Sequence, residues 1–422
     1  MRICGGWGMG YERWFETTIG EQATLQRGID ITKAQQNPGK VPVVSSSGIS
    51  SYHDTAPITS PGVVLGRKGV VGSVYYITQD YWPHDTTLWV KDFHGNYPRF
   101  VYYFFKSIAS RLSTMDVGSA NPTLNRNHVH PIKILWPPLD EQKAIAHILG
   151  TFDDKIELNQ QMNRTLEAIA RAIFKSWFID FDPVRAKMDQ RQPAGMDAET
   201  AALFPDEFED SPLGKIPKGW EILTLGDLGK IVTGKTPSTK IPEYFGGDVP
   251  FITPTDMDGR KGIAETARYL TKQGVQAVRS IVVPGGSIAV SCIGSNMGKV
   301  IYILKDSVTN QQINSIIVND KFSKEYLYYN LSDRRIELQN MAGGGSAVPI
   351  LNKSHFSAIE ILIPNLVLLN RFDKIAHYLT VKNFHNDKHT QALSSIRDTL
   401  LPKLLSGEIR VKDAEKIVEE VV

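Results

Sequence analysis

GSANPTLNRNHVHPIKILWP at Gly118–Pro137 recurs as GSAVPILNKSHFSAIEILIP at Gly345–Pro364. Identical residues return at a constant offset of 227, which pairs Asn125 with Asn352. An offset of this length is too long for a solenoid repeat. The stretch therefore predicts two similar domains in one chain, an arrangement that can form a pseudo-dimer and that suits a two-part target.

The repeat extends to both sides of this stretch, at offsets that drift along the chain. Offsets of 206, 208 and 230 relate Trp14 to Trp220, Gly28 to Gly234, Pro42 to Pro250, and Ile145–His147 to Ile375–His377. The drift implies extra residues in the second globular half. Each half is therefore expected to contain a mixed globular region followed by a helical region.

Size and composition limit the class of protein. A chain of 422 residues predicts two or three domains, and 41% apolar with 22% charged residues is ordinary for a soluble globular protein. Cys4 and Cys292 form no motif, which favours a reducing compartment. No apolar run reaches the roughly 20 residues that span a bilayer, and no signal peptide is recognisable, so we expect a cytoplasmic protein without a membrane partner.

Charge is unevenly distributed along the chain. Residues 1–139 carry 13 Lys/Arg and 9 Asp/Glu, and residues 214–364 carry 17 and 13, so each globular half has a net charge of +4. Residues 192–213 carry six acids and no Lys or Arg, and read as a linker. The pattern permits nucleic-acid binding without requiring it.

Each globular half alternates short apolar runs with Gly, Pro and polar residues, which predicts a mixed α/β (α+β) domain with an irregular sheet. Each half also contains one expected helix, at Arg99–Leu112 and at Lys324–Met341. The expected strands are Val41–Val44, Gly62–Leu65, Ser73–Ile77, Thr87–Val90, Val249–Thr253, Ser287–Cys292, Val300–Leu304 and Asn314–Val318.

From Asp140 onward the apolar period becomes seven. One position of the heptad holds Ile145, Phe152, Asn159, Leu166 and Ile173, and the other holds Leu149, Ile156, Asn163, Ala170 and Trp177. This pattern predicts a coiled coil, in which the two Asn fix the register. Helix Asp140–Trp177 would be about 57 Å long at ~1.5 Å per residue.

A weaker seam follows the second half, with Leu379, Asn386, Leu393 and Leu400 at one position and Ile375, Lys382, His389 and Ile396 at the other. Pro402 is expected to kink or end this helix. The two seams most simply pair as an antiparallel coiled coil, because a whole domain separates them. The alternative is an amphipathic helix that lies on its own domain. The predicted regions are 1–139, 140–191, 192–213, 214–364 and 365–422.

Catalytic and metal-binding patterns are poorly supported. Gly229–Thr236 matches the expression G-x-x-x-x-G-K-[ST] of a phosphate-binding loop. That loop requires a helix to start at its Lys-Thr, whereas Pro237 follows at once and disfavours helical geometry at Thr236. Gly234 is better interpreted as a turn glycine that corresponds to Gly28. His and Cys show no metal-ligand spacing.

Polar loop residues in both halves form a candidate DNA-reading surface. Arg, Lys, Asn and Gln make paired hydrogen bonds with base edges, and basic residues contact phosphates. Such residues also occur in the loops of every soluble protein. The candidates are Ser46, Ser47, Arg67, Lys68, Asn125, Arg126, Thr253, Thr255, Asp256, Ser295, Asn296, Lys299, Gln311, Gln312, Ser346, Asn352 and Lys353.

Three motifs together resemble those of type I restriction-modification specificity subunits. Lys175–Val184 (KSWFIDFDPV) resembles the end of the family's central conserved region, and Leu400–Ile409 (LLPKLLSGEI) resembles the end of its C-terminal conserved region. Trp220, Leu225–Asp227 and Gly234–Pro237 resemble the start of its second target-recognition domain. The resemblance covers essentially the whole chain.

The resemblance implies a DNA-recognition subunit without catalytic activity. Two target-recognition domains with pseudo-two-fold symmetry, held apart by two antiparallel helices, would each read one half of a bipartite asymmetric site in double-stranded DNA. The helices would dock two methyltransferase subunits, through which restriction subunits join. S-adenosylmethionine, ATP and Mg would be bound by those partners, and none by this chain. The residues assigned to helix pairing and docking are Ile145, Leu149, Phe152, Ile156, Asn159, Asn163, Leu166, Trp177, Phe178, Leu379, Leu393 and Leu400.

Two alternatives remain open at this point. The chain could be an enzyme, a DNA methyltransferase or nuclease that acts alone. It could instead be a scaffold that binds proteins through its helices and does not bind DNA.

Overall fold

The computed structural model describes residues 14–115, 123–263, 265–294, 297–342 and 350–421. These residues divide into two compact units, and each unit contains one globular part and one portion of each long helix. We call them unit 1, which comprises Met1–Gln160 and Lys388–Val422, and unit 2, which comprises Gln161–Asp387.

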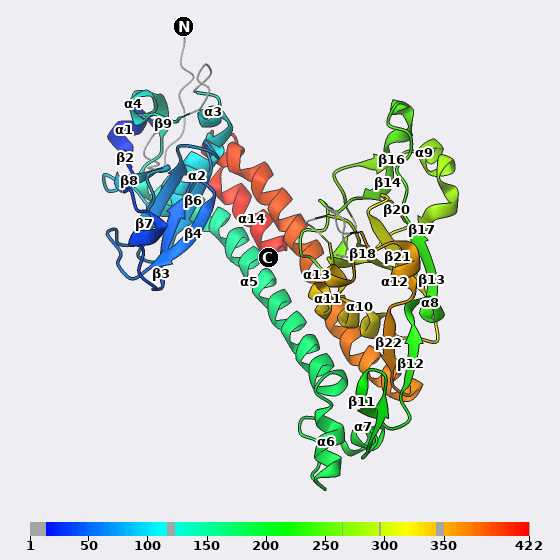
Figure 1. The fold of residues 1–422 in the computed structure, drawn as a ribbon. Helices are drawn as coiled ribbons and strands as arrows, with labels where there is room; N and C mark the ends of the chain where they lie inside the picture. The colour runs from blue at the N-terminus through cyan, green and yellow to red at the C-terminus, as the bar shows by residue number, and fades with distance from the viewer. Residues whose placement is uncertain (1–13, 116–122, 264, 295–296, 343–349, 422) are drawn as a thin grey trace. The chain divides into compact units, whose positions relative to one another are not determined.

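Unit 1 is a mixed α/β unit (Figure 1). Its strands are β1 (Phe15–Thr18), β2 (Thr24–Arg27), β3 (Val41–Ser45), β4 (Gly48–His53), β5 (Gly62–Gly66), β6 (Val74–Ile77), β7 (Trp82–Pro83), β8 (Thr87–Asp92) and β9 (Lys133–Trp136). Its helices are α1 (Ile19–Gln22), η1 (Lys33–Gln35), α2 (Pro98–Ser107), α3 (Ala109–Ser113), α4 (Arg126–Val129), α14 (Val411–Val421) and parts of α5 (Leu139–Phe178) and α13 (Leu366–Leu405). The strands form sheets in the orders β2-β8-β5-β6, β4-β3-β7 and β1-β9.

Unit 2 has more strands than unit 1 among the described residues. They are β10 (Phe208–Ser211), β11 (Gly214–Pro217), β12 (Glu221–Thr224), β13 (Gly229–Thr233), β14 (Phe245–Ile252), β15 (Gly262–Ile263), β16 (Tyr269–Leu270), β17 (Val282–Val283), β18 (Ile288–Ser291), β19 (Val300–Ile303), β20 (Ser307–Thr309), β21 (Ile313–Val318) and β22 (Glu360–Ile363). The remaining helices are α6 (Asp182–Met188), α7 (Ala198–Ala202), α8 (Leu225–Leu228), η2 (Pro242–Tyr244), α9 (Lys272–Ala277), η3 (Arg279–Ile281), α10 (Lys324–Asp333), α11 (Arg335–Ala342) and α12 (Lys353–Ser357). The sheet orders are β13-β21-β18-β19-β15, β16-β14-β20-β17, β12-β22 and β10-β11.

The two globular parts repeat the same strand register. Phe15 lies opposite Trp136 in the β1–β9 pair, and Glu221 lies opposite Ile363 in the β12–β22 pair. The two pairs are related residue by residue through the sequence offsets of 206 and 227. The parallel pairs also correspond, since β3 lies beside β7 as β14 lies beside β20. The repeat detected in the sequence is therefore a repeat of backbone structure.

The helix expected in each globular part is broken in two. The break falls at Ile108, between α2 and α3, and at Arg334, between α10 and α11. At both residues the backbone leaves helical geometry, with φ/ψ of −100°/7° and −96°/20°. Because Ile108 and Arg334 occupy corresponding positions in the repeat, the break belongs to the shared fold.

In unit 1 the long helices pair through an apolar cluster, to which the globular part also contributes side chains. Ile145, Leu149 and Phe152 of α5 are almost fully buried and share this cluster with Leu393 and Leu400 of α13. The helices run antiparallel, because Asp153 pairs with Arg397 whereas Asn159, farther along α5, contacts His389 and Thr390. The cluster is closed by Leu25, Leu65, Leu88, Phe100 and Phe105.

In unit 2 the same two helices pair through aromatic side chains. Phe174 and Trp177 of α5 pack against Phe372 of α13, with ring centroids 5.9 and 6.2 Å apart. Asn163 of α5 contacts Asn383 and Asp387 near the other end of this stretch, so the pairing is again antiparallel. The mixed α/β class and the antiparallel pairing of the long helices are thus confirmed.

The seam of α13 differs in detail from the heptad assignment. Lys382 is exposed, whereas Thr380 and Asn383 are buried. Pro402 lies within the last turn of α13, which continues to Leu405. A proline so near the end removes only one backbone hydrogen bond of the final turn, so the helix ends one turn later than expected.

The acidic stretch 192–213 is a folded part of unit 2. Asp197 caps α7 by accepting from Thr200 N, and it also pairs with Arg371 of α13. Phe204 is buried against Trp177, with ring centroids 5.3 Å apart. Across the described residues, no helix combines the length and the apolar content that crossing a membrane requires.

Candidate nucleic-acid interface

In unit 1, the six DNA-binding candidates gather near the start of β8. Thr86 O accepts hydrogen bonds from Arg67 N and Lys68 N, at 2.8 and 3.0 Å, and Thr86 Oγ1 accepts from Ser46 N at 3.3 Å. Leu124 N donates to Arg67 O at 2.9 Å, which brings the adjacent residues 125–126 to the same edge. The loops after β3 and β5 and the loop before α4 therefore meet there.

The candidates at this edge differ in what their side chains can offer. Ser47, Lys68 and Arg126 are exposed. Ser46 is buried, and its carbonyl oxygen accepts hydrogen bonds from the hydroxyls of Ser73 and Tyr75. Asn125 has a structural contact, because its side chain caps α4 by accepting from Asn127 N at 3.0 Å.

Arg67 is held in place but is incompletely paired. Its Nη1 is buried and has no hydrogen-bond partner in the part of the chain that the structure describes. Burial, reinforced by the nearby Arg27 cation, lowers the pKa of Arg67, although a guanidinium stays protonated at neutral pH. A buried donor without a partner is unfavourable, so Arg67 is an incompletely satisfied cation beneath this edge.

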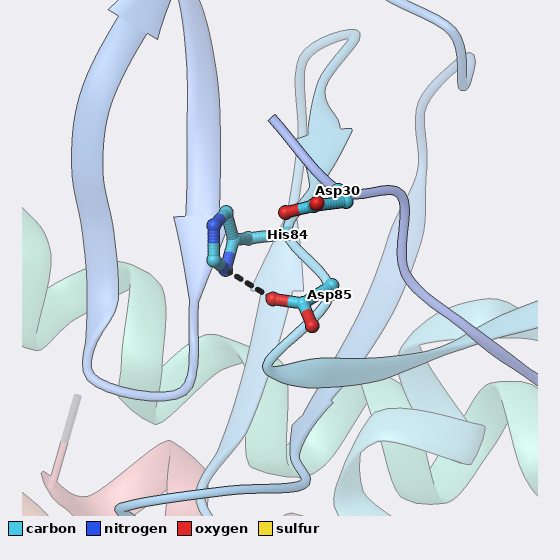
Figure 2. A group of neighbouring side chains, drawn as sticks. All are labelled: Asp30, His84 and Asp85. Atoms are coloured by element: carbon cyan, nitrogen blue, oxygen red, sulfur yellow. Dashed lines mark ion pairs between the residues drawn. The ribbon is translucent and has the colours of Figure 1, made fainter. Parts of the chain in front are cut away.

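Sequence reasoning missed four polar residues beside this edge, namely Arg27, Asp30, His84 and Asp85. Figure 2 shows Asp30, His84 and Asp85 gathered together, with His84 Nδ1 3.2 Å from Asp85 Oδ1. Asp85 also binds Arg27, at 2.8 Å between Oδ2 and Nη2. Their positions in the sequence could have identified them. Arg27 and Asp30 lie close to the turn glycine Gly28, and His84 and Asp85 belong to the segment that approaches this glycine.

A divalent cation is one ligand that this group could hold. Asp30, His84 and Asp85 each offer one ligand atom, and these atoms lie within 4.8 Å of one another. However, Asp85 is already engaged by Arg27, and His84 Nδ1 also lies 3.0 Å from Thr86 Oγ1. The contacts present therefore serve first to orient Arg27 and the turn before β8.

In unit 2, the corresponding turn carries amides. Thr236 Oγ1 donates to Gln311 Oε1 at 2.7 Å, and Asn310 Nδ2 donates to Gln312 Oε1 at 3.0 Å. Gln311 is exposed, whereas Asn310 is buried. Asn310 N donates to Ile252 O at 3.0 Å, so this turn lies beside the loop that follows β14.

The loop after β14 uses its polar groups internally. Asp256 Oδ2 accepts from Thr253 N and Oγ1 at 2.8 and 2.6 Å, and Thr253 Oγ1 lies 2.7 Å from Thr255 Oγ1. Thr255 and Asp256 also line a cavity of about 320 Å³ together with Arg260. The side chains of Thr253, Thr255 and Asp256 therefore stabilise the conformation of this loop, and Thr255 and Asp256 also form part of its surface.

The remaining unit 2 candidates are spread more widely. Lys299 Nζ donates to Met257 O at 2.7 Å and lines a cavity of about 350 Å³ with Arg171 and Arg335. Asn352 caps α12 by accepting from His355 N at 2.9 Å, and Lys353 is exposed. Ser295, Asn296 and Ser346 lie outside the described residues.

The residues assigned to helix pairing and docking face mostly inward. In unit 1, Ile156 and Asn159 are buried along with the apolar seam residues. In unit 2, Trp177 and Phe178 are buried, whereas Leu166, Asn163 and Leu379 are half-buried. Exposed apolar side chains occur on the other faces of the same helices within this unit, at Met162, Ile169, Tyr378 and Val381.

Comparison with known proteins places these features in one family. The family profile described as the type I restriction modification DNA specificity domain matches residues 11–168 and again 217–386. The chain is 39% identical over 347 residues to the type I restriction enzyme HindI specificity subunit of Haemophilus influenzae, covering 72% of this chain and 74% of that protein. It is 28% identical over 327 residues to the MjaIX specificity subunit of Methanocaldococcus jannaschii, covering 76% and 71%.

A solved structure shares the fold. The S subunit of a type I restriction-modification system from M. genitalium matches with a TM-score of 0.61 and 17% identity, over 94% of this chain and 97% of that chain. The first profile match begins just before β1 and ends within α5, and the second begins just before β12 and ends within α13. The two matches therefore coincide with the two copies of the internal repeat. The chain therefore belongs to the family of type I restriction-modification DNA specificity subunits.

Proposed function

We propose that this chain is the non-catalytic DNA-recognition subunit of a type I restriction-modification complex. Each globular part reads one half of a bipartite, asymmetric site in double-stranded DNA. The observation that carries the proposal is that the two parts repeat one backbone while their polar edges differ, with Arg27 and Asp85 in unit 1 where unit 2 has Thr233 and Gln311. A repeated frame with different side chains suits the reading of two different half-sites.

The proposal assigns affinity and specificity to different groups. Exposed cations such as Lys68, Arg126 and Lys353 contact phosphates, which gives strong, salt-dependent binding. Side chains at the strand ends contact base edges and select the sequence.

The long helices serve in the proposal as the platform for partners. Two methyltransferase subunits, which carry S-adenosylmethionine, dock on the helices, and ATP- and Mg-dependent restriction subunits join through them in the cytoplasm. The inward seam residues hold the platform together. The exposed apolar residues Met162, Ile169, Tyr378 and Val381 are the contacts that we assign to partners, since apolar side chains favour protein interfaces.

Domain exchange tests this function. A chain in which residues 1–139 are replaced by the first globular region of another specificity subunit should, with its methyltransferase partners, methylate a site altered in one half only. Changes in both halves, or in neither, would contradict modular reading. Methyl transfer by the purified chain alone would favour an enzyme, and partner binding without salt-dependent DNA binding would favour a protein scaffold.

A further inference from the structure

One turn has the same backbone hydrogen bonds in both units. In unit 1, Gly28 N donates to Thr87 O and Ile29 N donates to Pro83 O, at 3.0 and 2.7 Å. In unit 2, Gly234 N donates to Ile313 O and Lys235 N donates to Thr309 O, at 3.0 and 2.9 Å. We call this structure the glycine corner: residues 27–30 with 83–87 in unit 1, and 233–236 with 309–313 in unit 2.

In each unit, two further hydrogen bonds fix the second segment of the corner, which is residues 83–87 in unit 1 and 309–313 in unit 2. His84 N donates to Val44 O in unit 1, and Asn310 N donates to Ile252 O in unit 2, at 2.9 and 3.0 Å. Thr87 N and Ile313 N then donate back to His84 O and Asn310 O, at 2.9 and 3.1 Å. The backbone hydrogen bonds of the corner therefore join corresponding residues in the two units.

The glycine at each corner is required by the same close approach. A Cβ on Gly28 would lie 2.1 Å from His84 O, and a Cβ on Gly234 would lie 2.1 Å from Asn310 O. Neither position tolerates a side chain without a shift of backbone. The backbone of the corner is therefore fixed, and the neighbouring side chains are free to vary.

The side chains that vary have different chemistry in the two units. Unit 1 places Arg27, Asp30, His84 and Asp85 where unit 2 has, in the same order, Thr233, Thr236, Asn310 and Gln311. The two segments of the corner approach each other in both units. One carboxylate oxygen of Asp30 lies within 4.8 Å of one of Asp85 in unit 1, and Thr236 donates to Gln311 in unit 2. Ionisable side chains in one corner correspond to hydroxyls and amides in the other.

We infer that the glycine corner is a specificity-determining site in each unit, with Arg27 selecting a guanine in one half-site and Gln311 selecting an adenine in the other. This inference rests on the proposed function. Its basis is the match between side-chain chemistry and the donor and acceptor pattern of each base in the major groove, where Arg pairs with guanine O6 and N7 and Gln pairs with adenine N6 and N7.

Arg27 is arranged for this role. Its side chain is 54% exposed, while the Asp85 carboxylate that binds Nη2 is only 18% exposed. The carboxylate fixes the orientation of the guanidinium but engages few of its five N–H donors, so others remain for a base. Lys68 and Arg67 lie close enough to act electrostatically on Asp85 and Arg27, which places phosphate-binding cations beside the base-reading group.

Gln311 is arranged in a similar way. It is exposed, and Thr236 donates to its Oε1. An amide oxygen has two lone pairs, so Gln311 keeps one acceptor position and both N–H donors for adenine. Lys235, exposed in the same corner, is the neighbouring cation.

The test exchanges the corners. The full-length chain carrying R27T, D30T, H84N and D85Q is expressed with its methyltransferase partners, and methylated bases are mapped across a genome that has no other methylation. We expect a changed base requirement at one or two adjacent positions of a single half-site, with the other half and the gap unchanged. The reciprocal chain with T233R, T236D, N310H and Q311D should alter the other half-site.

A matched control uses the same residue types at the other end of β8. Asp92 and His94 also contact each other, through Asp92 Oδ1 and His94 N at 2.7 Å. The D92N/H94N chain should retain the original site. If it changed the same base requirement as the exchanged corner, the inference would be overturned.

A milder variant covers the case in which the exchanged corner fails to fold. Arg27→Lys keeps the charge but loses the fork that pairs with guanine, so discrimination against the other bases should fall by about 5- to 150-fold while overall methylation persists. Unchanged discrimination in this variant would overturn the inference. Absence of site-specific methylation with the unaltered chain would instead contradict the proposed function itself.

Discussion

Lys261 Nζ lies 3.1 Å from Glu325 Oε2, and both side chains are almost completely buried in unit 2. The ammonium group also donates to Tyr329 OH at 2.6 Å and to Thr380 Oγ1 at 2.7 Å. The ring of Tyr328 lies below it, with its centroid 4.6 Å from Nζ. This network joins the segment before β15 to α10 and α13, so it fixes the globular part of unit 2 on its long helix.

Removing the lysine should therefore weaken unit 2 strongly. Lys261→Met leaves Glu325 buried without its cation, which should lower the free energy of unfolding by about 3–5 kcal/mol. Removing both charges with K261M/E325L should cost much less. Hydrogen exchange of unit 2 amides would measure both effects. The exposed Lys218–Glu207 pair is the control, since K218M should leave the exchange rates unchanged. Equal losses in the single and double variants would contradict this account.

A tyrosine joins each globular part to α5. Tyr103 OH donates to Asp153 Oδ2 at 2.6 Å in unit 1, and Tyr329 OH donates to Glu167 Oε2 at 3.1 Å in unit 2. The two tyrosines occupy corresponding positions in the repeat. Tyr103→Phe should lower the free energy of local unfolding of unit 1 by about 1.5–3 kcal/mol, because the hydrogen bond is to a charged group. Tyr329→Phe should lower that of unit 2 by more, because it also removes an acceptor from the buried Lys261 ammonium. Hydrogen exchange resolved by segment would check this, and an effect spread equally over both units would contradict it.

The glycine corner should resist even the smallest side chain. Gly28→Ala and Gly234→Ala each place a Cβ 2.1 Å from a carbonyl oxygen, which should lower the free energy of unfolding on the order of 1–3 kcal/mol. Gly150→Ala is a suitable comparison, because the three atoms nearest to its Cβ all belong to the guanidinium end of the Arg99 side chain, the nearest at 2.7 Å, and to no backbone group. Denaturant unfolding monitored separately in the two units would measure the loss, and an unaffected Gly28→Ala protein would contradict the required close approach.

The polar layer within unit 2 should set the pairing of its helices. Asn163 donates to Asp387 Oδ1 at 2.7 Å and accepts from Asn386 Nδ2 at 2.9 Å. Burial already raises the pKa of Asp387, so loss of its amide partner should raise that pKa further. Asn163→Leu should therefore lower the free energy of unfolding by about 1–3 kcal/mol near neutral pH. Leucine at the exposed Thr165 is the control, and a gain of stability with N163L alone would contradict the prediction.

The two capping boxes should contribute a pH-dependent stability. Hydrogen bonds from Thr17 and Thr18 lower the pKa of Glu21, and those from Thr224 lower the pKa of Asp227. A lowered folded-state pKa gives a contribution that is present above the unfolded value, about 4.3 for Glu and 3.9 for Asp, and is lost as the pH falls through the folded value. The stability difference between wild type and E21Q or D227N should thus disappear in acid. Thermal unfolding from pH 3 to pH 7 would show it, and a pH-independent difference would contradict it.

The sequence predicted those helices and strands that show a regular spacing of apolar residues. The strands near Val43, Val64 and Val290 and the two long helices follow from alternating and heptad patterns, because burial on one face imposes that spacing. The helix breaks at Ile108 and Arg334 were missed, since an apolar run does not reveal where a helix is interrupted. The seam of α13 was placed imperfectly, since Thr380 and Asn383 are buried for their hydrogen bonds rather than for apolar area.

The candidate interface was predicted less completely. The sequence made Lys68 and Arg126 candidates for DNA contact, and both are exposed. The glycine corner was not found, because Arg27 and Asp85 are 58 residues apart and meet only through the pairing of β2 with β8. A pattern within a short stretch of sequence cannot predict a contact between residues so far apart along the chain.

The sequence by itself determined that the chain holds two copies of one fold, each followed by a long helix, because residues that recur in the same order in both halves indicate a repeated backbone. Only the tertiary structure decided which polar groups act together. Lys261 with Glu325, Tyr103 with Asp153, and Arg27 with Asp85 are each brought together by strand pairing and helix packing. The physical reason is that hydrogen bonds and ion pairs act over a few ångströms in space, whatever the separation of their partners along the chain.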